Sequence, residues 1–461
     1  MWRPQPIAFL KPLRTAVAIV APFLFSGSAH SAEESSAPPK IVFIMADDLG
    51  YAELGCYGQT KIRTPRIDHL AREGVRFTQF YSGSPVCAPA RCVLLTGKHS
   101  GHAWIRSNGE VQPEGQRPIP DGEVTIAESL RERGYATACI GKWGLGFPGS
   151  EGDPVKQGFD LFFGYNCQRE AHNFYPHHLW RDEEKVMLEG NDRGLTGKQY
   201  SHDLLEAEAL EFIKTNREKP FFLYVPFTIP HVALQVPEDS LAEYKGKWDD
   251  PPYEGGRGYL PHPHPRAAYA AMVTRMDRSV GRILDRLKEL DLDENTIVFF
   301  TSDNGPTHDA GGADSGFFES AKPFRGLKGS VYEGGLRAPL VVRWPRKIAA
   351  GRESDHVSAF QDVFPTLCNL AGAKSPEGLD GISFLPTLRG AKDQPEHEHL
   401  YWEFFGYGGQ QAVRLGNWKG VRRGLHKGDL ELQLYDLSRD IAESKKVAAD
   451  HPYVAARIRA I

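Results

Sequence analysis

The sequence predicts an α/β fold with a large, mainly parallel sheet flanked by helices, followed by a small C-terminal antiparallel subdomain. Continuous apolar runs, typical of buried parallel strands, alternate with segments of helical periodicity along most of the chain. Strands that alternate with helices favour a parallel sheet. After about residue 375 the pattern changes to short apolar segments, which favours a separate antiparallel sheet.

The first 39 residues are expected to lie outside this fold. Residues 1–32 combine a positive segment (Arg3, Lys11 and Arg14), an apolar stretch over 15–25 and a run of small residues, which is typical of a signal peptide. The apolar stretch is too short to span a bilayer, and no cysteine marks a lipid attachment site, so we expect no membrane anchor. Residues 33–39 are polar and proline-rich and are predicted to be a linker. The protein is therefore expected to be secreted or periplasmic.

Composition narrows the range of partners. The 461 residues suffice for one large domain and a smaller one. The formal net charge of −4 gives no reason to expect a nucleic-acid partner. The six cysteines are too sparse for a disulfide scaffold, and their spacing indicates no pairing.

Residues 40–375 are predicted to form one catalytic domain. Thr64 and Pro65 begin a helix as N-cap and first helical residue. The clearest helix covers 265–290, where Met272, Met276 and Val280 recur at four-residue steps. The predicted strands are 40–45, 77–81, 135–140, 220–225, 296–301 and 339–342. The predicted helices are 64–73, 125–133, 201–216, 265–290 and 358–371.

Residues 376–461 are predicted to form an α+β subdomain. Its short apolar segments are 400–404, 412–421 and 432–437, and they are expected to pair as antiparallel strands. Residues 452–461 are expected to be a terminal helix that ends without a cap or a glycine.

Two of the predicted strands end in acidic or amide residues. Asp47 and Asp48 follow the first strand, and Asp303 and Asn304 follow the strand 296–301. The carboxyl ends of parallel strands meet at one edge of the sheet, where sites form. Either pair alone would more often cap a helix or a turn. Together they offer the hard oxygen ligands that suit Ca²⁺ or Mg²⁺, so we predict a metal site at this edge.

A third pattern surrounds Cys87. Residues 85–91 read PVCAPAR, and residues 94–97 read LLTG. A lone cysteine in an exported protein is usually a buried hydrophobe or a disulfide partner. The arrangement Cys-x-Pro-x-Arg with Leu-Thr-Gly behind it, however, resembles the signature of the sulfatase family. Further segments that resemble this family follow in order: 134–143 (GYATACIGKW), 230–231 (PH), 302–305 (SDNG), 328–335 (KGSVYEGG) and 434–437 (LYDL).

The resemblance covers nearly the whole mature chain and implies an alkaline-phosphatase/sulfatase-like fold. In this family a separate maturation enzyme oxidises the cysteine to formylglycine, which implies the same for Cys87. It also implies that Asp47, Asp48, Asp303 and Asn304, with residue 87, hold Ca²⁺, Mg²⁺ being the alternative. The aldehyde would be hydrated, one hydroxyl would attack sulfur with the help of the metal, and the second would then expel sulfate.

The same resemblance implies roles for four basic residues. Arg91 is expected to pair with the formylglycine and with the carboxylates of the metal site. Lys142 and Lys328 are expected to bind sulfate oxygens as point charges. His231 is expected to contact the ester oxygen and to help protonate the leaving alcohol. Lys142 and His231 each follow a predicted strand, and Lys328 lies in a glycine-rich loop.

The sequence departs from the family pattern at Gly144. Many sulfatases have a histidine after Gly-Lys-Trp that assists turnover of the sulfated intermediate, whereas this chain reads GKWGLG over 141–146. We expect His172, in the unusual segment 168–178, to take over that role. The alternative, that this segment only shapes the substrate pocket, stays open.

Export, an anionic leaving group and several aromatic and basic loop residues suggest a sulfated carbohydrate substrate. Arg169, Tyr175 and Trp180 are candidate sugar contacts, although aromatic residues are more often part of a core. Two other functions fit the same motifs. One is a formylglycine-dependent hydrolase of phosphonate monoesters or phosphodiesters. The other is a catalytically inactive protein that binds sulfated glycans, which would require Cys87 to stay unmodified.

Overall fold

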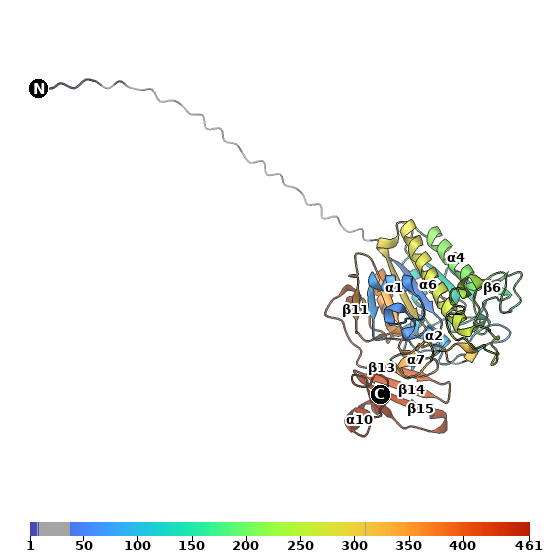
Figure 1. Cartoon of the computed structure of the whole chain (residues 1–461). Helices are drawn as coiled ribbons and strands as arrows, with labels where there is room; N and C mark the ends of the chain where they lie inside the picture. The colour runs from blue at the N-terminus through green and yellow to red at the C-terminus, as the bar shows by residue number, and fades with distance from the viewer. Residues whose placement is uncertain (7, 9–36, 309) are drawn as a thin grey trace. The chain divides into compact units, whose positions relative to one another are not determined.

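The computed structural model describes residues 1–6, 8, 37–308 and 310–461, and it divides the chain into two units, Met1–Ala37 and Pro38–Ile461. Most of the expected signal peptide and linker, residues 7 and 9–36, lies outside the described residues. Within the described part, no helix has the length and apolar character needed to cross a bilayer. The larger unit, Pro38–Ile461, carries the elements labelled in Figure 1.

A large mixed sheet with a parallel centre forms the middle of the larger unit. The described residues give this sheet ten strands. In the order in which they pair, they are β11 (Arg352–Ser354), β2 (Val75–Phe77), β10 (Leu340–Arg343), β9 (Thr296–Ser302), β1 (Lys40–Ala46), β8 (Phe221–Pro226), β4 (Ala136–Lys142), β5 (Leu161–Tyr165), β6 (His178–Arg181) and β7 (Glu184–Met187). The run from β9 to β5 is parallel, as predicted. On either side of it, β10 and β6 pair in antiparallel fashion.

Helices cover both faces of the sheet. One face packs against α1 (Pro65–Arg72), α4 (Ser201–Thr215), α5 (Glu238–Leu241) and α6 (Pro265–Glu289), and α4 and α6 lie side by side (Figure 1). The other face packs against α2 (Cys87–Thr96), α3 (Ile126–Arg131), α8 (Val363–Ala371) and α9 (Leu385–Arg389). Alternate residues of β1 enter the two cores: Val42 and Ile44 face the first, Ile41 and Phe43 the second. This two-sided burial explains why β1 is apolar without interruption.

The C-terminal region contains the small antiparallel sheet that the sequence predicted. Its strands are β13 (Leu400–Phe404), β14 (Gln410–Leu415), β15 (Trp418–Arg423) and β16 (Gln433–Asp436), and α10 (Pro452–Ala460) follows. The predicted single segment 412–421 is in fact a hairpin, because Leu415 pairs with Trp418 across a two-residue turn. Gly416 occupies the first turn position with φ of 58°, which glycine adopts without strain.

Two other segments differ from the prediction. Residues 77–81 belong to two separate strands, β2 and β3 (Phe80–Tyr81), and β3 pairs with β12 (Ser358–Ala359). The helix predicted over 358–371 begins only at Val363, after β12 and a 3₁₀ turn. In both places a short strand that pairs with a distant segment interrupts the local pattern. Such long-range pairing leaves little trace in the sequence.

Candidate active site

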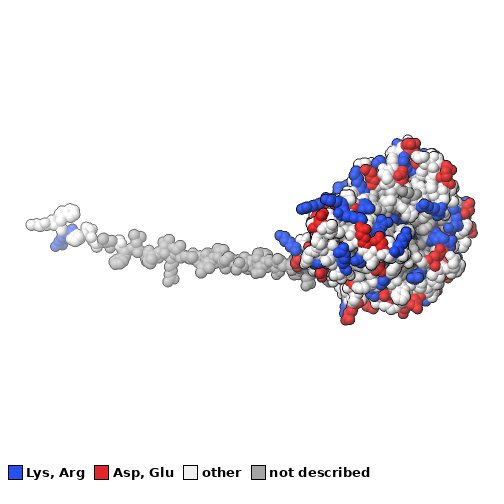
Figure 2. All heavy atoms as spheres, turned by 90° about the horizontal axis from the view of Figure 1, so that it is seen from below, with Lys and Arg blue, Asp and Glu red and all other residues white. Residues whose placement is uncertain are grey.

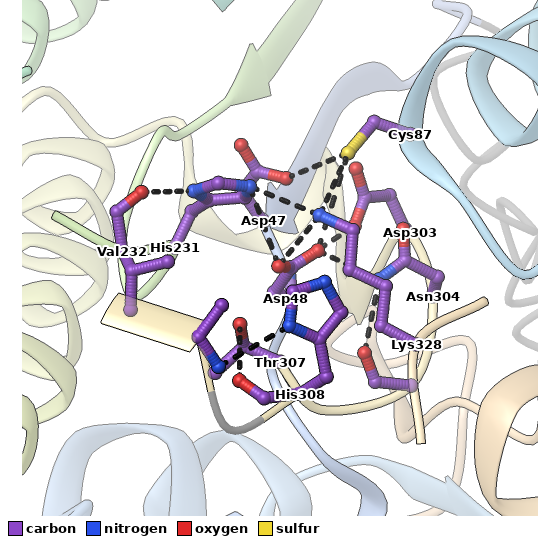
Figure 3. Close-up of polar contacts among 12 residues, drawn as sticks. Asp47, Asp48, Cys87, His231, Val232, Asp303, Asn304, Thr307, His308 and Lys328 are labelled. Carbon is purple, nitrogen blue, oxygen red and sulfur yellow. Dashed lines mark hydrogen bonds and ion pairs between the residues drawn. The ribbon is translucent and has the colours of Figure 1, made fainter. Parts of the chain in front are cut away.

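Two neighbouring strand ends bring the four predicted metal ligands together. Parallel pairing of β1 with β9 sets Ala46 opposite Ser302, so Asp47 and Asp303 emerge next to each other. The backbone N–H of Asp48 donates to Oδ1 of Asp303 at 3.1 Å. The Asn304 side-chain amide donates to Oδ1 of Asp48 at 2.8 Å (Figure 3). Asp48 has φ of 64°, a conformation that is uncommon outside glycine and that occurs at functional sites.

Cys87 is the first residue of α2 and faces these carboxylates (Figure 3). Its Sγ lies 3.4 Å from Oδ1 of Asp47 and 4.0 Å from Oδ1 of Asp48. The thiol is 1% exposed. Burial, and next the negative charge of Asp47, raise the pKa of Cys87 to about 12. An unmodified Cys87 is therefore a neutral thiol at physiological pH and a weak nucleophile.

The residues present fit a hard divalent cation. Three buried carboxylates and one amide meet at this point, and oxygen ligands of this kind are those that Ca²⁺ and Mg²⁺ prefer. Oδ1 of Asn304 is buried and has no hydrogen-bond partner, although buried polar atoms are normally satisfied. Asp47, Asp48, Cys87 and His231 also offer ligand atoms within 4.8 Å of one another. The arrangement is a possible metal site.

Three cations balance the three carboxylates, and two of them, Arg91 and Lys142, are fully buried. Arg91, one turn after Cys87 on α2, donates to Oδ2 of Asp303 at 2.8 Å and approaches Oδ1 of Asp47 at 3.7 Å. Lys142 ends β4 and donates to Oδ2 of Asp47 at 2.6 Å. Burial is the largest single effect and would lower the pKa of Lys142, but the raising effects around it, first the charge of Asp47, together outweigh burial, so the pKa is raised. Lys142 therefore stays protonated.

Lys328 approaches from the glycine-rich loop and joins three parts of the site. Its Nζ donates to Oδ2 of Asp48 at 2.7 Å and lies 3.5 Å from the sulfur of Cys87. It also lies 2.9 Å from Nε2 of His231. Although burial opposes the charged form, Asp48 raises the pKa of Lys328 well above its usual value. The ammonium group is thus fixed beside position 87.

His231 follows β8 and adds a neutral imidazole to the site. Its Nδ1 faces the carbonyl oxygen of Val232, so Nδ1 carries the hydrogen and Nε2 accepts from Lys328. Nε2 also lies 3.4 Å from Oδ2 of Asp48. Burial, and next the charges of Lys328 and Lys142, lower the pKa of His231 well below its usual value.

His172 does not contact the carboxylates directly, because the ring of His231 lies between them. It ends a 3₁₀ turn, Glu170–His172, and its ring stacks on that of His231 with centroids 4.1 Å apart. The structure also shows why Gly144 is not a histidine. Gly144 has φ of 88°, and a Cβ there would lie 2.9 Å from Nε2 of Gln168. A side chain at position 144 would therefore be strained.

The three candidate sugar contacts do not share one surface. Tyr175 is 3% exposed and packs against Tyr200, so its assignment as a sugar contact was wrong. Trp180 lies on β6, and its indole N–H donates a hydrogen bond to Glu114 at 2.7 Å. Arg169 lines a cavity that also contains His172.

His308 belongs to the site but was missed in the sequence. Its ring lies beside Asp48 and Lys328 (Figure 3), and its Nδ1 accepts from the backbone N–H of Ala310 at 3.3 Å. Burial, and next Lys328, lower its pKa. The signal that could have found it is its position four residues after Asn304, in the loop that leaves β9.

Comparisons with known proteins identify the family of this chain. The family model described as Sulfatase matches residues 39–373, and that described as N-sulphoglucosamine sulphohydrolase, C-terminal, matches residues 327–459. Steryl-sulfatase of Mus musculus is 32% identical over 91% of this chain and 75% of its own. N-acetylgalactosamine-6-O-sulfatase of Bacteroides thetaiotaomicron is 32% identical over 91% of this chain and 92% of its own. The crystal structure of Ps i-CgsB in complex with k-i-k-neocarrahexaose has a TM-score of 0.77 at 28% identity and 91% coverage of each chain.

The α/β fold, a large central sheet flanked by helices with a small antiparallel sheet, is shared with this solved structure. The chain belongs to the sulfatase family. It is a sulfuric ester hydrolase, as the resemblance in the sequence implied.

Proposed function

We propose that this enzyme releases sulfate from a sulfated carbohydrate, using formylglycine at position 87 and a calcium ion held by Asp47, Asp48, Asp303 and Asn304. The observation that carries the proposal is the position of Cys87. Its sulfur lies 3.4 Å from a carboxylate oxygen of Asp47 and 3.5 Å from the ammonium group of Lys328. Nucleophile, predicted metal ligands and anion-binding charge thus meet in one volume.

Cys87 requires modification before it can serve this chemistry. As a thiol with its pKa raised to about 12, it is a poor nucleophile at neutral pH. Formylglycine, installed by a maturation enzyme, would supply an oxygen nucleophile and a route for releasing sulfate, while a bound divalent cation would lower the pKa of that oxygen.

The basic residues prepare the site for a sulfate ester. Lys142 and Lys328 hold fixed positive charges beside position 87, where they can bind sulfate oxygens. Arg91 donates to Asp303 and to the carbonyl oxygen of Lys142, so it positions both the carboxylate and the end of β4. Arg91 and Lys142 are fully buried and the Lys328 side chain is 9% exposed, and electrostatic stabilisation is strongest where water is excluded.

The histidines are assigned to proton transfer. His231 has one nitrogen fixed by the Val232 carbonyl and the other directed at Lys328, so a proton can be exchanged at Nε2 near the leaving alcohol. His172 stacks on His231 and is partly exposed, which suits a group that acts after the alcohol has left. We assign to it the role that Gly144 cannot fill.

The polarity beside the site favours a sugar over a sterol as the leaving alcohol. The named activities of the relatives include both classes. A cavity of about 450 Å³ that includes His172 is lined, beside Ala233, Gly258 and Leu260, mainly by polar residues, three of them arginines: Arg169, Arg193, Arg257, Asn173 and Tyr259. Such a lining would leave a sterol ring system beside desolvated charges, whereas sugar hydroxyls can hydrogen-bond to it.

Processing and domain structure complete the proposal. We assign residues 1–32 to a cleaved signal peptide, residues 33–39 to a linker, 40–375 to the catalytic domain and 376–461 to the C-terminal subdomain. The protein is then secreted or periplasmic.

Mass spectrometry of the peptide that contains residue 87 tests the proposal most directly. Protein produced with a formylglycine-generating enzyme is expected to lose about 18 Da at this residue. It should hydrolyse an aryl sulfate faster than an aryl phosphodiester. Cys87→Ala should abolish this activity, whereas Cys92→Ala, a change at another buried cysteine of α2, should leave it largely intact. An unmodified, inactive protein or a preference for the phosphodiester would contradict the proposal.

A further inference from the structure

The cavity beside His172 has a lining rich in arginine. Its volume is about 450 Å³, and Arg169, Arg193 and Arg257 line it together with His172, Asn173 and Tyr259. We call it the arginine cavity. None of its lining residues within the described part of the chain is acidic. Because the whole chain carries a net charge of −4, this concentration of guanidinium groups is a local feature.

The arginine cavity adjoins the reaction centre. His172, in its wall, stacks on His231 at 4.1 Å, and Tyr259 lies 6.0 Å from His172. The charge of Arg257 contributes to the lowered pKa of His308, after burial and Lys328. A ligand whose sulfate sits beside Cys87 can therefore extend into this cavity.

The three arginines differ in whether a carboxylate of the protein already pairs with the guanidinium group. Nε of Arg169 donates to Glu110 at 2.8 Å, and Arg193 pairs with Glu170. These two ion pairs fix the wall of the cavity. Arg257 is exposed, and no carboxylate of the described residues lies within ion-pair distance of it. With respect to the described residues, Arg257 therefore contributes a positive charge that no ion pair compensates.

The loops that carry the arginines are held in place by hydrogen bonds. The side-chain amide of Asn173 donates to the carbonyl oxygen of Arg193 at 2.8 Å. Gly256 and Tyr259 pair through their backbones on either side of Arg257. A preformed cavity binds with less loss of conformational entropy than one that must be ordered by its ligand.

We propose that the arginine cavity binds a second anionic group of the substrate, a sulfate or a carboxylate, while the reacting sulfate lies beside Cys87. This inference rests on the proposed function and specifies its substrate class as glycans with at least two anionic groups. Arginine forms paired, charge-assisted hydrogen bonds with both oxyanions. Figure 2 shows that basic and acidic side chains are interspersed over the face in view, so that face offers no comparable selection.

Competition against hydrolysis of an aryl sulfate, which has no second anion, tests the inference. Two matched pairs of competitors distinguish the sources of charge. Glucosamine 6-sulfate against glucosamine 2-N,6-O-disulfate tests a second sulfate, and N-acetylgalactosamine 6-sulfate with and without an attached glucuronate tests a carboxylate. In the wild type, at least one doubly anionic competitor should inhibit about 10-fold better than its partner, the effect of one charge-assisted contact.

Variants assign that advantage to the cavity. Arg257→Ala should reduce it to about 2-fold or less, and Arg257→Lys should retain part of it, since the charge remains. Arg217→Ala removes an exposed arginine next to the start of β8, at the opposite edge of the sheet, and should leave the advantage unchanged. The advantage is a ratio of two inhibition strengths measured on the same variant, so a change in aryl sulfate turnover in an Arg257 variant does not affect it, and Arg217→Ala should keep that turnover within about 2-fold.

The outcomes separate this inference from the proposed function. Failure of the wild type to hydrolyse the aryl sulfate contradicts the proposed function. Normal aryl sulfate turnover without an advantage for either doubly anionic competitor contradicts only the inference. An advantage that persists in both Arg257→Ala and Arg193→Gln, with unchanged melting temperatures, also overturns it.

Discussion

At the scale of single residues, the site matches each buried carboxylate with a cation. Lys142 contacts Asp47, Lys328 contacts Asp48, and Arg91 contacts Asp303 at distances from 2.6 to 2.8 Å. The three carboxylates and the three cations sum to zero. A divalent cation bound beside Asn304 would therefore give the site a net charge of two, which favours an anionic ester and its nucleophile. Oδ1 of Asn304 has no hydrogen-bond partner, so it is the oxygen most readily available to coordinate the cation.

The Asn304 side chain therefore provides a test of calcium binding. Calcium at about 100 times its dissociation constant should stabilise the wild type by about 2.7 kcal/mol, because ligand binding to the folded state shifts unfolding by mass action. Asn304→Ala should shrink the calcium-dependent rise in melting temperature. Asn216→Ala, at the C-terminal end of α4, should not. Equal calcium shifts in Asn304→Ala and the wild type would exclude Asn304 as a ligand.

His172 is the second residue whose role can be measured. If it replaces the histidine that position 144 cannot carry, His172→Ala should lower kcat about 100-fold, the usual contribution of a general acid or base. Release of the first equivalent of alcohol should stay fast, because the defect lies in turnover of the sulfated enzyme. The matched control is His177→Ala, an exposed histidine of the same segment. Unchanged turnover in His172→Ala would show that His172 has no role in proton transfer and only shapes the substrate pocket.

At the scale of elements, strands that are buried on both faces were predictable. β1, β8 and β9 appear in the sequence as continuous apolar runs, and polar residues at their ends mark the site. α2 was not predicted, although it carries Cys87 and Arg91. Every residue of α2 is buried, so it shows no amphipathic period, and Pro89 interrupts the pattern in the first turn, where no backbone N–H is needed.

The antiparallel strands β6 and β7 could not be predicted either. They add to the sheet beyond β5, and most of their residues are partly or fully exposed. They therefore lack the apolar run that revealed β1. Only the family resemblance placed Lys328 in the site, because its loop reaches the site through backbone hydrogen bonds to Pro85 and Pro306, which no local pattern encodes. The arginine cavity likewise joins segments that are distant in the sequence.

The short helix α7 (Glu333–Leu336) links the catalytic loop to the C-terminal sheet through a buried ion pair. Glu333 is fully buried and accepts from Lys419 of β15 and from Arg337 at 2.7 and 2.9 Å. Burial alone would raise the pKa of Glu333, but the charges of Lys419 and Arg337 outweigh it, so the pKa is lowered. The carboxylate thus contributes stability above its ordinary pKa of about 4.3, and this is lost as the pH falls toward the lowered value.

Removing the charge of Glu333 should consequently be costly. Glu333→Gln leaves Lys419 buried beside a neutral amide, and loss of one partner of a buried pair typically costs about 3–5 kcal/mol. Denaturant unfolding at pH 7 should show this loss, and the difference from the wild type should shrink toward pH 3. Glu431→Gln breaks the exposed pair with Lys446 and should cost less than about 1 kcal/mol. A Glu333→Gln variant as stable as Glu431→Gln would contradict this argument.

At the scale of the whole molecule, the C-terminal sheet shares a hydrophobic core with the segments that carry Cys87 and Lys328. Trp402 and Tyr435 of this sheet pack in one cluster with Val86, Val331 and other residues of the catalytic part. The indole of Trp402 also donates to the carbonyl oxygen of Ser82 at 2.9 Å. The sheet therefore supports both the start of α2 and the loop of Lys328.

This shared core predicts that residues 40–375 do not fold into an active enzyme alone. A chain ending at residue 375 would expose the cluster around Val86 and lose the bond from Gln410 to the carbonyl oxygen of Gly329, at 2.7 Å in the full chain. It should be poorly soluble, lack near-ultraviolet circular dichroism and show no sulfatase activity, while the full chain should unfold in one transition. Removal of α10 alone, which packs on a separate cluster, should lower the melting temperature but preserve activity. A soluble, active 40–375 chain would show instead that the catalytic domain is independent of the sheet that contacts it.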